Sequence, residues 1–373
     1  MRVAWITTGF VENEQDYNGA AFLHNLAKEL SLTGKIDLNI FALYYPIRNS
    51  DFSFYNANVF LCRDKGEKTT RVPKIEKLKA FMKCMQKFKK EHTRIKFDVI
   101  HSIWSGESGY IASLLSKKYD VPLATSIGGG ELGEIPEIKY GSRLKFWQKK
   151  FVNRTFKQAK VIVTGSDYIT YKIKQYFAYE FHVKTVKIPF GVDEKVFFPA
   201  QKSSDGTIKL INISTAFAVK AHIDLFKALK IVKEKYPNVL LECYGKNVDS
   251  SLQKIADEMD LKENVKLNGY IEYEKIPDAL HQSDIFVLSS LYESQNMAVL
   301  EAAFCGLPVV STDVGVAAEI TPHIVKPHDY EGLAKKILYV MENPAVDYRN
   351  LSERFSLSSS VKGFARLYYS LKK

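Results

Sequence analysis

The chain is poor in cysteine and has no long hydrophobic run. Four cysteines occur in 373 residues, far apart and without a C-x-x-C pair. This spacing argues against a disulfide framework or a zinc site and suits a reducing compartment. No apolar run approaches the roughly 20 residues that cross a bilayer, and the first ten residues, MRVAWITTGF, lack the pattern of a secretory signal peptide. We therefore expect a cytoplasmic protein.

Several other patterns are missing. With 12 prolines and 20 glycines the chain is neither collagenous nor of low complexity, and 46% hydrophobic with 25% charged residues is ordinary globular composition. The eight histidines form no H-E-x-x-H motif, and no two aspartates stand two positions apart, so no D-x-D metal motif is present. We expect neither a bound metal nor a cofactor. The length predicts two or three domains.

Acidic residues are scarce in the first half of the chain. Residues 1–190 carry 31 basic and 18 acidic side chains, whereas residues 191–373 carry 22 and 24. The excess is concentrated in 63–96, with 13 basic and four acidic residues, and in 139–160, with eight basic and none acidic. Such asymmetry indicates an anionic partner. We favour weak contact with an anionic membrane over nucleic acid, and two solvated lysine-rich faces remain the alternative.

Short β-rich runs alternate with helical stretches along the whole chain, which predicts an α/β protein with parallel sheets and crossover helices, built twice. The predicted strands are 2–7, 36–43, 98–101, 122–125 and 161–164 in the first half, and 208–213, 239–244, 265–269, 285–288 and 308–311 in the second. The predicted helices are 20–32, 75–92, 108–118, 141–160, 221–235, 252–260, 276–281, 297–305, 330–342 and 361–371.

A proline-bracketed segment, 188–199, separates the two halves. We predict an N-terminal domain over 1–187, a C-terminal domain over 188–354, and a final helical segment within 355–373. Ligands of open parallel sheets bind outside the carboxyl ends of the strands, so the active site is expected in a central cleft that the two domains face.

The predicted helix 141–160 mixes basic and aromatic residues. Helical spacing places Leu144, Trp147 and Phe151 on one side. A basic amphipathic helix with aromatic residues can lie on an anionic membrane surface. We expect instead that Trp147 and Phe151 pack against the sheet, which leaves the lysines to attract anionic lipid weakly.

The most informative stretch follows the predicted strand 285–288. It holds two carboxylates eight positions apart, Glu293 in a loop and Glu301 in the helix that follows. The unpaired backbone N–H groups that open this helix, near Asn296, favour a phosphate. Amides for a diphosphate and two carboxylates for ribose and sugar hydroxyls would suit a nucleotide diphosphate sugar. The two glutamates alone fit an ordinary surface helix equally well.

The surrounding residues add a resemblance. The stretch 292–315, YESQNMAVLEAAFCGLPVVSTDVG, resembles the E-x7-E segment of family 4 glycosyltransferases, a retaining group with the two-domain GT-B fold. The segment 189–199, PFGVDEKVFFP, is similar to that family's interdomain linker. FDVIH at 97–101, VTGS at 163–166, LECYG at 241–245, NGY at 268–270 and PVVSTDVG at 308–315 fall where the family has similar segments. The resemblance covers nearly the whole chain.

The resemblance implies roles for particular residues. Glu301 would hold the ribose hydroxyls, Glu293 would lie beside the donor sugar as a catalytic residue, and Lys220 would contact the diphosphate and stabilise the leaving nucleotide. Gly19 matches the glycine-rich loop after the first strand. The other donor-binding residues implied are Gly245, Asn268, Gly269, Tyr270, Gln295, Asn296, Met297, Ala298 and Val299. Gly128, Gly129 and Glu131 are expected to face the acceptor. The resemblance also implies that the domain 1–187 binds the acceptor, that the domain 188–354 binds the nucleotide-sugar donor, and that the helix within 355–373 returns to the first domain.

Three departures from the family pattern concern the donor. Ser214 and Thr215 replace a usual Gly-Arg pair, Gly128 stands where a histidine is common, and 294–296 replaces the usual Gly-Phe-Gly. We interpret them as the choice of a subfamily. The implied activity is transfer of a hexosyl group from a UDP- or GDP-linked sugar to an acceptor hydroxyl (EC 2.4 class) in synthesis of a cell-surface glycan or glycolipid. The enzyme would work in the cytoplasm or as a peripheral protein on the inner membrane face.

Two alternatives stay open. A glycosyltransferase scaffold that binds nucleotide without turnover would also explain the missing arginine and histidine. An NAD-dependent dehydrogenase would require the G-x-G-x-x-G at 128–133 to be a dinucleotide fingerprint, but that motif should follow the first strand of its unit and precede an acidic residue. Here it follows a later strand, and residues 143–160 contain no acidic side chain.

Overall fold

The computed structural model describes residues 1–18, 20–48, 50–63, 72–200, 206–346, 348 and 350–372. The chain divides into two compact units. Unit 1 comprises Met1–Gly165, Ile169–Gly191 and Leu357–Lys373, and unit 2 comprises Ser166–Tyr168 and Val192–Ser356. The chain therefore passes from one unit to the other within the proline-bracketed segment, at 191–192, and again just before the last helix.

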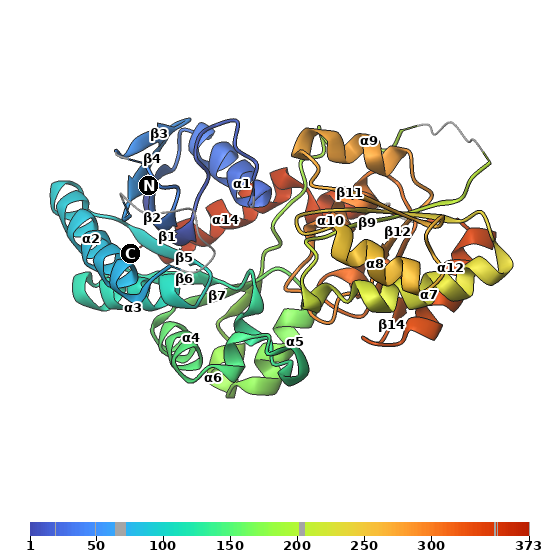
Figure 1. Ribbon diagram of the computed structural model, residues 1–373. Coiled ribbons are helices and arrows are strands. Elements are labelled where there is room, and N and C mark those ends of the chain that lie inside the picture. Colours follow the sequence, from blue (N-terminus) through green and yellow to red (C-terminus); the bar gives the residue numbers. More distant parts are fainter. Residues whose placement is uncertain are drawn as a thin grey trace. The chain divides into compact units, whose positions relative to one another are not determined.

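Unit 1 contains a sheet of eight strands in the order β3-β4-β2-β1-β5-β6-β7-β8 (Figure 1). All neighbours pair in parallel except β3 and β4, which are antiparallel. The strands are β1 (Arg2–Gly9), β2 (Asp37–Tyr45), β3 (Phe52–Phe54), β4 (Ala57–Leu61), β5 (Val99–Ile103), β6 (Leu123–Ser126), β7 (Val161–Thr164) and β8 (Thr185–Lys187).

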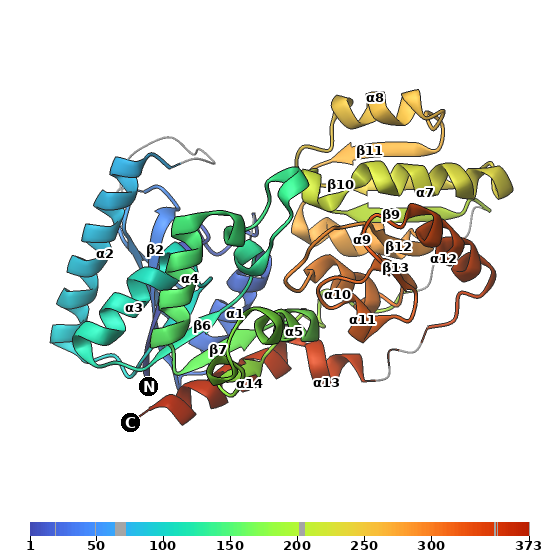
Figure 2. The same cartoon turned by 90° about the horizontal axis from the view of Figure 1, so that it is seen from below.

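Helices cover both faces of this sheet. One layer holds α2 (Lys74–Arg94), α3 (Glu107–Tyr119) and α4 (Phe146–Gln158), and the other holds α1 (Ala21–Leu32) and α14 (Leu357–Leu371) (Figure 2). The remaining helical segments are α5 (Asp167–Tyr176), α6 (Tyr179–His182) and the 3-10 turns η1 (Gly130–Leu132), η2 (Pro136–Ile138) and η3 (Ser142–Leu144).

A buried polar chain fixes α14 on unit 1. The indole N–H of Trp5 on β1 donates to the Tyr368 hydroxyl at 2.8 Å, and that oxygen lies 2.7 Å from Nδ1 of His101 on β5. Burial lowers the pKa of His101 to about 3, so its imidazole is neutral at physiological pH. These contacts make the last helix part of the core of unit 1.

Unit 2 contains a fully parallel sheet in the order β11-β10-β9-β12-β13-β14. Its strands are β9 (Lys209–Ile213), β10 (Leu240–Tyr244), β11 (Val265–Gly269), β12 (Ile285–Leu288), β13 (Val309–Thr312) and β14 (Ile324–Val325). Its helical segments are η4 (Ala218–Lys220), α7 (His222–Lys235), α8 (Ser250–Glu258), η5 (Tyr273–Lys275), α9 (Ile276–His281), α10 (Met297–Phe304), α11 (Ala317–Ile320), α12 (Tyr330–Glu342) and α13 (Leu351–Phe355).

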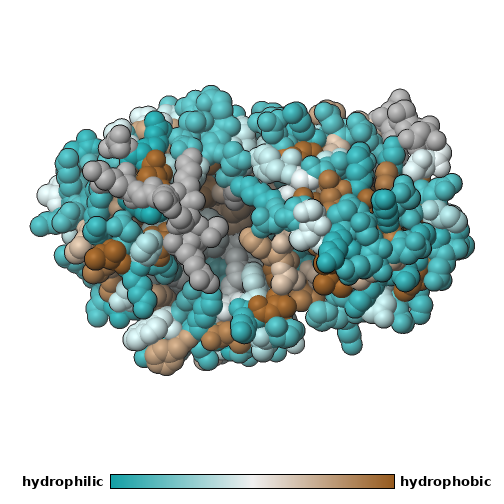
Figure 3. Space-filling view, in the orientation of Figure 1, coloured by the Kyte–Doolittle hydropathy of each residue, from teal (hydrophilic) through white to brown (hydrophobic). Residues whose placement is uncertain are grey.

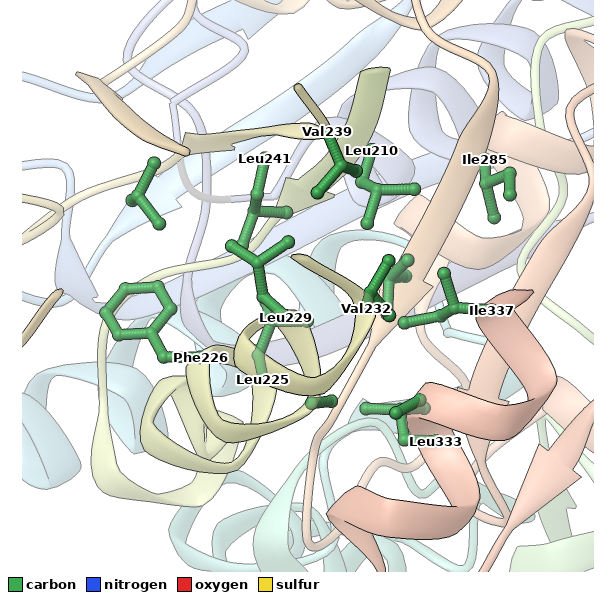
Figure 4. Packing of buried hydrophobic residues seen from close by; sticks show 14 of the residues in the cluster. Leu210, Leu225, Phe226, Leu229, Val232, Val239, Leu241, Ile285, Leu333 and Ile337 are labelled. Carbon is green, nitrogen blue, oxygen red and sulfur yellow. The ribbon is translucent and has the colours of Figure 1, made fainter. Parts of the chain in front are cut away.

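Two hydrophobic cores lie on the two faces of the unit 2 sheet. On one face, Leu225 and Leu229 of α7 pack with Leu333 and Ile337 of α12 beneath strand residues such as Leu241 (Figure 4). On the other, α10 packs with residues of β12 and of the segment that enters unit 2. The apolar residues of α7 recur every three or four positions, which is why one side of that helix is buried.

The predicted α/β class and the two parallel sheets are confirmed. The predicted helix 141–160 is wrong at its start, because residues 142–144 form a 3-10 turn and the α-helix begins at Phe146. The placement of its aromatic residues is wrong as well. Trp147 is 66% exposed instead of packed on the sheet, whereas the ring of Phe151 packs at a tilt against Tyr110 of α3, with ring centroids 4.6 Å apart. The sequence analysis also missed β3, β4, β8 and β14.

Candidate active site

The predicted donor residues of unit 2 gather at the carboxyl ends of its strands. The strand order reverses between β9 and β12, because the connections after β9 lead to β10 on one side and those after β12 lead to β13 on the other. At such a point the loops after the two strands leave a crevice in which ligands of open sheets bind. The loop after β9 carries Lys220, and the loop after β12 carries Glu293.

The two loops are bonded to each other. The ammonium of Lys220 lies 2.5 Å from Oε1 of Glu293, and the Ser290 hydroxyl donates to the same oxygen at 2.7 Å. The Ser289 hydroxyl donates to the backbone carbonyl of Lys220 at 2.9 Å. Lys220 and Glu293, which the sequence assigns to catalysis, are therefore brought together as an ion pair whose position is fixed by hydroxyl and backbone contacts.

The start of α10 offers unpaired donors. Asn296 caps the helix, with its side-chain oxygen accepting from the backbone N–H of Val299 at 3.1 Å. The N–H groups of Met297 and Ala298 have no acceptor within the described part of the chain. Two free amides at a helix N-terminus favour an anion. Val299 is also a predicted donor-binding residue, but its backbone N–H already donates to the Asn296 side chain.

Glu301 lies one turn further along α10 and is only 8% exposed. Burial raises the pKa of its carboxyl to about 7. No side-chain hydrogen bond to Glu301 occurs among the described residues, so nothing from the protein compensates its desolvation. A buried carboxylate that receives no hydrogen bond from the protein suits a ligand whose hydroxyl groups can donate to it.

Two glycines allow the backbone to approach closely at this edge. Gly245 after β10 has φ +146°, and a Cβ there would lie 2.1 Å from the carbonyl oxygen of Ser214. Gly315 has φ +59°, and its Cβ would lie 2.5 Å from the carbonyl oxygen of Gln295. Both positions therefore require glycine. Gly245 was predicted, whereas Gly315 was part of the quoted motif without an assigned role.

The other predicted donor residues occupy the same edge in different ways. The Asn268 amide donates to Glu242 at 3.3 Å, and the backbone N–H of Gly245 donates to the carbonyl of Gly269 at 2.7 Å. Tyr270 is half exposed. Gln295 is buried, and its carbonyl accepts from the N–H of Val316 at 2.8 Å. Gly19 lies outside the described residues.

Sequence analysis missed a polar cluster beneath Lys220. The Ser214 hydroxyl donates to Oδ1 of Asn212 at 2.7 Å and lies 3.3 Å from Nε2 of His222, so it accepts from that nitrogen. Burial, with a smaller contribution from Lys220, lowers the pKa of His222 to about 4 and keeps the ring neutral. Ser214, which departs from the family's glycine, is thus held in a buried network. Ser214 and His222 are eight positions apart in the sequence, and nothing in that spacing predicted their contact.

The predicted acceptor residues lie in unit 1, at the carboxyl ends of β5 and β6. Glu131 is buried, and its carboxylate accepts from the backbone N–H groups of Ser105, Gly128 and Gly129 at 3.2, 3.4 and 2.7 Å. Burial raises the pKa of Glu131 although these bonds oppose the shift. Its carboxylate therefore ties two loops together. The G-x-G-x-x-G segment continues into 3-10 turns, not into the α-helix that a dinucleotide fingerprint opens.

These loops border a cavity of about 330 Å³ in unit 1. Trp104 contributes its ring and has φ +67°, a left-handed conformation that a bulky residue adopts at a cost. Glu107, the first residue of α3, accepts from Lys77 at 2.6 Å and from the Tyr44 hydroxyl at 2.8 Å. The cavity is lined by Thr8, Lys77, Trp104, Gly106, Glu107, Gly129, Gly130, Glu131, Ser142 and Gln148.

Two features do not occur among the described residues. No group of three or more His, Cys, Asp or Glu side chains in this part of the chain is arranged to hold a metal ion. No helix within the described ranges has the length and apolarity needed to cross a membrane.

Comparisons with known proteins identify similar glycosyltransferases. Residues 193–357 match the family model described as glycosyl transferases group 1. Over 143 residues, 37% of this chain, the sequence is 34% identical to a phosphatidylinositol N-acetylglucosaminyltransferase subunit of Arabidopsis thaliana. Over 212 residues, 49% of this chain, it is 28% identical to a GDP-mannose-dependent monoacylated alpha-(1-6)-phosphatidylinositol monomannoside mannosyltransferase of Corynebacterium glutamicum. The matched parts are 32% and 55% of these relatives' lengths.

Solved structures extend the likeness to the whole chain. A sucrose-phosphate synthase from Thermosynechococcus elongatus superposes with a TM-score of 0.78 at 18% identity, covering 100% of this chain and 99% of that one. At this identity the likeness shows the fold alone, and that fold is GT-B, as predicted. The family match falls on unit 2, which carries Lys220, Glu293 and Glu301, and over residues 193–357 the chain is similar to the glycosyl transferases group 1.

Proposed function

We propose that the chain is a retaining glycosyltransferase that moves a hexosyl group from a UDP- or GDP-linked sugar to an acceptor hydroxyl. The observation that supports the proposal is that three complementary groups lie on the loops that follow β9 and β12 and on the helix α10 that comes after them. They are the Lys220–Glu293 ion pair, the free amides of Met297 and Ala298, and the buried carboxyl of Glu301. The cation and the amides would bind the negatively charged diphosphate, and the unpaired carboxyl of Glu301 would bind the ribose hydroxyls.

Each group has a place in the reaction. The amides of α10 and the Lys220 ammonium would take the diphosphate, and Lys220 would stabilise the negative charge that grows on the leaving nucleotide. Glu293, beside that ammonium, would orient a sugar hydroxyl and stabilise positive charge at the anomeric carbon. Glu301 would accept hydrogen bonds from the ribose. No step in this scheme is assigned to a metal or cofactor.

The acceptor would enter the unit 1 cavity. Its wall combines the Trp104 ring with the carboxylate of Glu107 and the ammonium of Lys77, which suits a ligand with hydroxyl groups on an apolar ring face. The two sequence relatives above are named for glycosylation of phosphatidylinositol lipids. We extend that class to this chain and propose a role in glycolipid or cell-surface glycan synthesis, with the enzyme at the cytoplasmic face of a membrane.

The test is a screen of nucleotide sugars for released nucleotide, with anomeric configuration of the product read by NMR. UDP-glucose, UDP-galactose, UDP-N-acetylglucosamine and GDP-mannose are the first donors, and titration with UDP, GDP and NAD runs beside them. We expect binding of UDP or GDP, no binding of NAD, and turnover of one donor. An inverted product would contradict retention.

Nucleotide binding without turnover of any donor would favour the second candidate, a glycosyltransferase scaffold that only binds nucleotide. The observation behind it is the loss of one phosphate-binding cation, because Ser214 and Thr215 stand where the family has Gly-Arg. Binding of NAD would support the alternative hypothesis that the chain is an NAD-dependent dehydrogenase.

A further inference from the structure

Two helices carry the rim of the unit 1 cavity. Lys77 comes from α2 and Gln148 from α4, and each lies within the first turns of its helix. Both helices precede a parallel strand and pack in the same layer, so their N-terminal ends lie at the carboxyl edge of the sheet, where the cavity opens. The first turns of both helices therefore lie at the same edge of the sheet as the cavity mouth.

On α2, that exposed surface is apolar. Ile75, Leu78 and Met82 are 64%, 57% and 47% exposed. Their spacing of three and four places them on one side of the helix, opposite the buried side that carries Ala80 and Cys84. Most of the molecular surface seen in Figure 3 is hydrophilic, and single exposed apolar residues are normal. Three exposed apolar residues on one side of the same helix form a continuous stripe, which is unusual for a helix surface that faces only water.

On α4, the first two residues are aromatic and exposed. Phe146 and Trp147 are 64% and 66% exposed, and their rings meet edge to face with centroids 5.4 Å apart. The Lys150 ammonium lies 4.3 Å from the centre of the Phe146 ring. Tryptophan with a nearby lysine is the side-chain combination that settles at the boundary between lipid headgroups and acyl chains.

Lysines accompany these apolar residues on both helices, although Lys77 is paired with Glu107 and Lys87 with Asp51. The segment 139–160 has no acidic residue. On α2, Glu76 is paired with Lys79, and Glu91 is paired with Arg2 and Arg94. The lysines of the two helices are Lys74, Lys77, Lys79, Lys83, Lys87, Lys89, Lys90, Lys149, Lys150 and Lys157.

We propose that unit 1 docks on an anionic lipid bilayer through the α2–α4 rim, defined as Ile75, Leu78, Met82, Phe146 and Trp147 with the neighbouring lysines. The apolar side chains enter the interfacial layer while the lysines contact lipid phosphates. The rim lies at the carboxyl edge of the unit 1 sheet, the edge at which the cavity opens, so a docked unit 1 brings the cavity mouth close to the membrane. An acceptor carried on a lipid would then reach the cavity without leaving the bilayer; this last clause alone rests on the proposed function.

The aliphatic members of the rim distinguish a bilayer from nucleic acid. Bases stack on aromatic rings, and Phe146 and Trp147 alone would serve that purpose. Ile75, Leu78 and Met82 gain little from a base or a phosphate but gain free energy when they leave water for an acyl region. The charge complementarity favours anionic over neutral lipid.

The test is sedimentation of the full-length protein with vesicles of phosphatidylcholine and of phosphatidylcholine with rising phosphatidylglycerol, at low and high salt. We expect binding that rises with anionic lipid and weakens with salt. The double variant Phe146→Ser, Trp147→Ser should weaken binding by about a hundredfold, since each buried aromatic contributes about 1.5 kcal/mol, a factor of about ten. Lys149→Gln with Lys150→Gln should weaken it about fivefold per lysine.

Matched controls come from the opposite edge of the sheet. Tyr179 and Val183, which are 75% and 65% exposed, lie in and just after α6, which precedes β8, and Lys117 and Lys118 lie in the last turn of α3. Tyr179→Ser with Val183→Ser, and Lys117→Gln with Lys118→Gln, should leave vesicle binding unchanged. Trp147 supplies a second readout, because its fluorescence should shift to the blue on anionic vesicles and the shift should vanish in Trp147→Phe.

The outcomes separate the docking from the activity. No vesicle binding at low salt, or equal losses in rim and control variants, would overturn the proposal. Tighter binding of single-stranded RNA, with the same sensitivity to the rim variants, would identify a nucleic-acid surface instead. Vesicle binding needs neither donor nor turnover, so an inactive protein that binds vesicles through the rim refutes the proposed function and leaves the docking standing.

Discussion

The pH dependence of nucleotide binding tests the assignment of Glu301. Its carboxyl is buried, has no donor among the described residues, and has a pKa raised to about 7 by burial. If ribose hydroxyls donate to it, the bound complex favours the carboxylate and the pKa falls on binding. Nucleotide affinity must then rise as the pH passes upward through 7, and at pH 7 each bound nucleotide should release about half a proton.

The magnitude follows from the same pKa. At pH 6, one unit below it, only about a tenth of the free protein holds Glu301 ionised, whereas at pH 8 nearly all of it does. Affinity for UDP or GDP should therefore increase about tenfold from pH 6 to pH 8 through this group alone. A terminal phosphate also titrates near pH 6, so the informative quantity is the difference between the wild type and Glu301→Gln.

The assay is calorimetric titration of wild type and Glu301→Gln with the nucleotide at pH 6, 7 and 8, in buffers of different ionisation enthalpy. The variant keeps the side-chain shape but cannot ionise. It should lose the tenfold rise and, at pH 8, bind about 10- to 100-fold more weakly, because charge-assisted hydrogen bonds contribute about 1.5–3 kcal/mol each. Parallel pH profiles for the two proteins would refute the reasoning.

The same pKa has a consequence for the stability of the free protein. A carboxyl whose folded pKa is raised binds more protons in the folded state than in the unfolded state between about pH 4.5 and 7. This contribution to the free energy of unfolding is therefore present at low pH and is lost as the pH rises through 7. Glu301→Gln should remove that loss, as urea unfolding at pH 5 and pH 8 would show.

Three further predictions concern other residues. Lys220→Gln should lower kcat for nucleotide release more than it raises KM, because the charge it stabilises grows mainly in the transition state; a change in KM alone would make Lys220 a ground-state contact. Gly245→Ala should lower both Tm and nucleotide affinity, since its Cβ would lie 2.1 Å from a carbonyl oxygen, whereas Gly34→Ala, with φ +67° and open space, should cost only about 1–2 kcal/mol of backbone strain. Tyr368→Phe should lower the free energy of unfolding by about 1–3 kcal/mol, because it leaves the buried Trp5 N–H and His101 without their partner, and Tyr369→Phe next to it, half exposed, should not.

The residues of the unit 2 site were predictable to different degrees. Glu293 and Glu301 stood out because the motif fixed their spacing and placed one in a loop and the other in the helix that follows. Their environments did not follow from the sequence. The ion pair of Glu293 needs Lys220, 73 residues away, and the raised pKa of Glu301 depends on burial by the rest of unit 2. Spacing in the sequence shows where two residues lie along one element. The residues that contact them from other elements depend on the order of the strands in the sheet.

The fold shows a similar division. Helices and buried strands with clear periodicity were placed within a few residues, because hydrophobic period is a local property. The missed strands β3, β8 and β14 are two or three residues long and lie at sheet edges, where pairing with one neighbour is enough to define a strand. Trp147 was misplaced because helical spacing identifies an apolar side of a helix and does not say whether the sheet or the solvent faces it.

The departures from the family pattern gain a physical meaning from the structure. Ser214 is held by Asn212 and His222, and the ring of His222 is neutral, so this cluster brings no cation to replace the usual arginine. Lys220 already shares its charge with Glu293. A diphosphate arriving here must therefore compete with that carboxylate for the ammonium, and the free amides of α10 must carry a larger part of its binding. Donor affinity in this chain should depend less on salt than in relatives that keep the arginine, because amide dipoles are screened less by ions than an exposed guanidinium is.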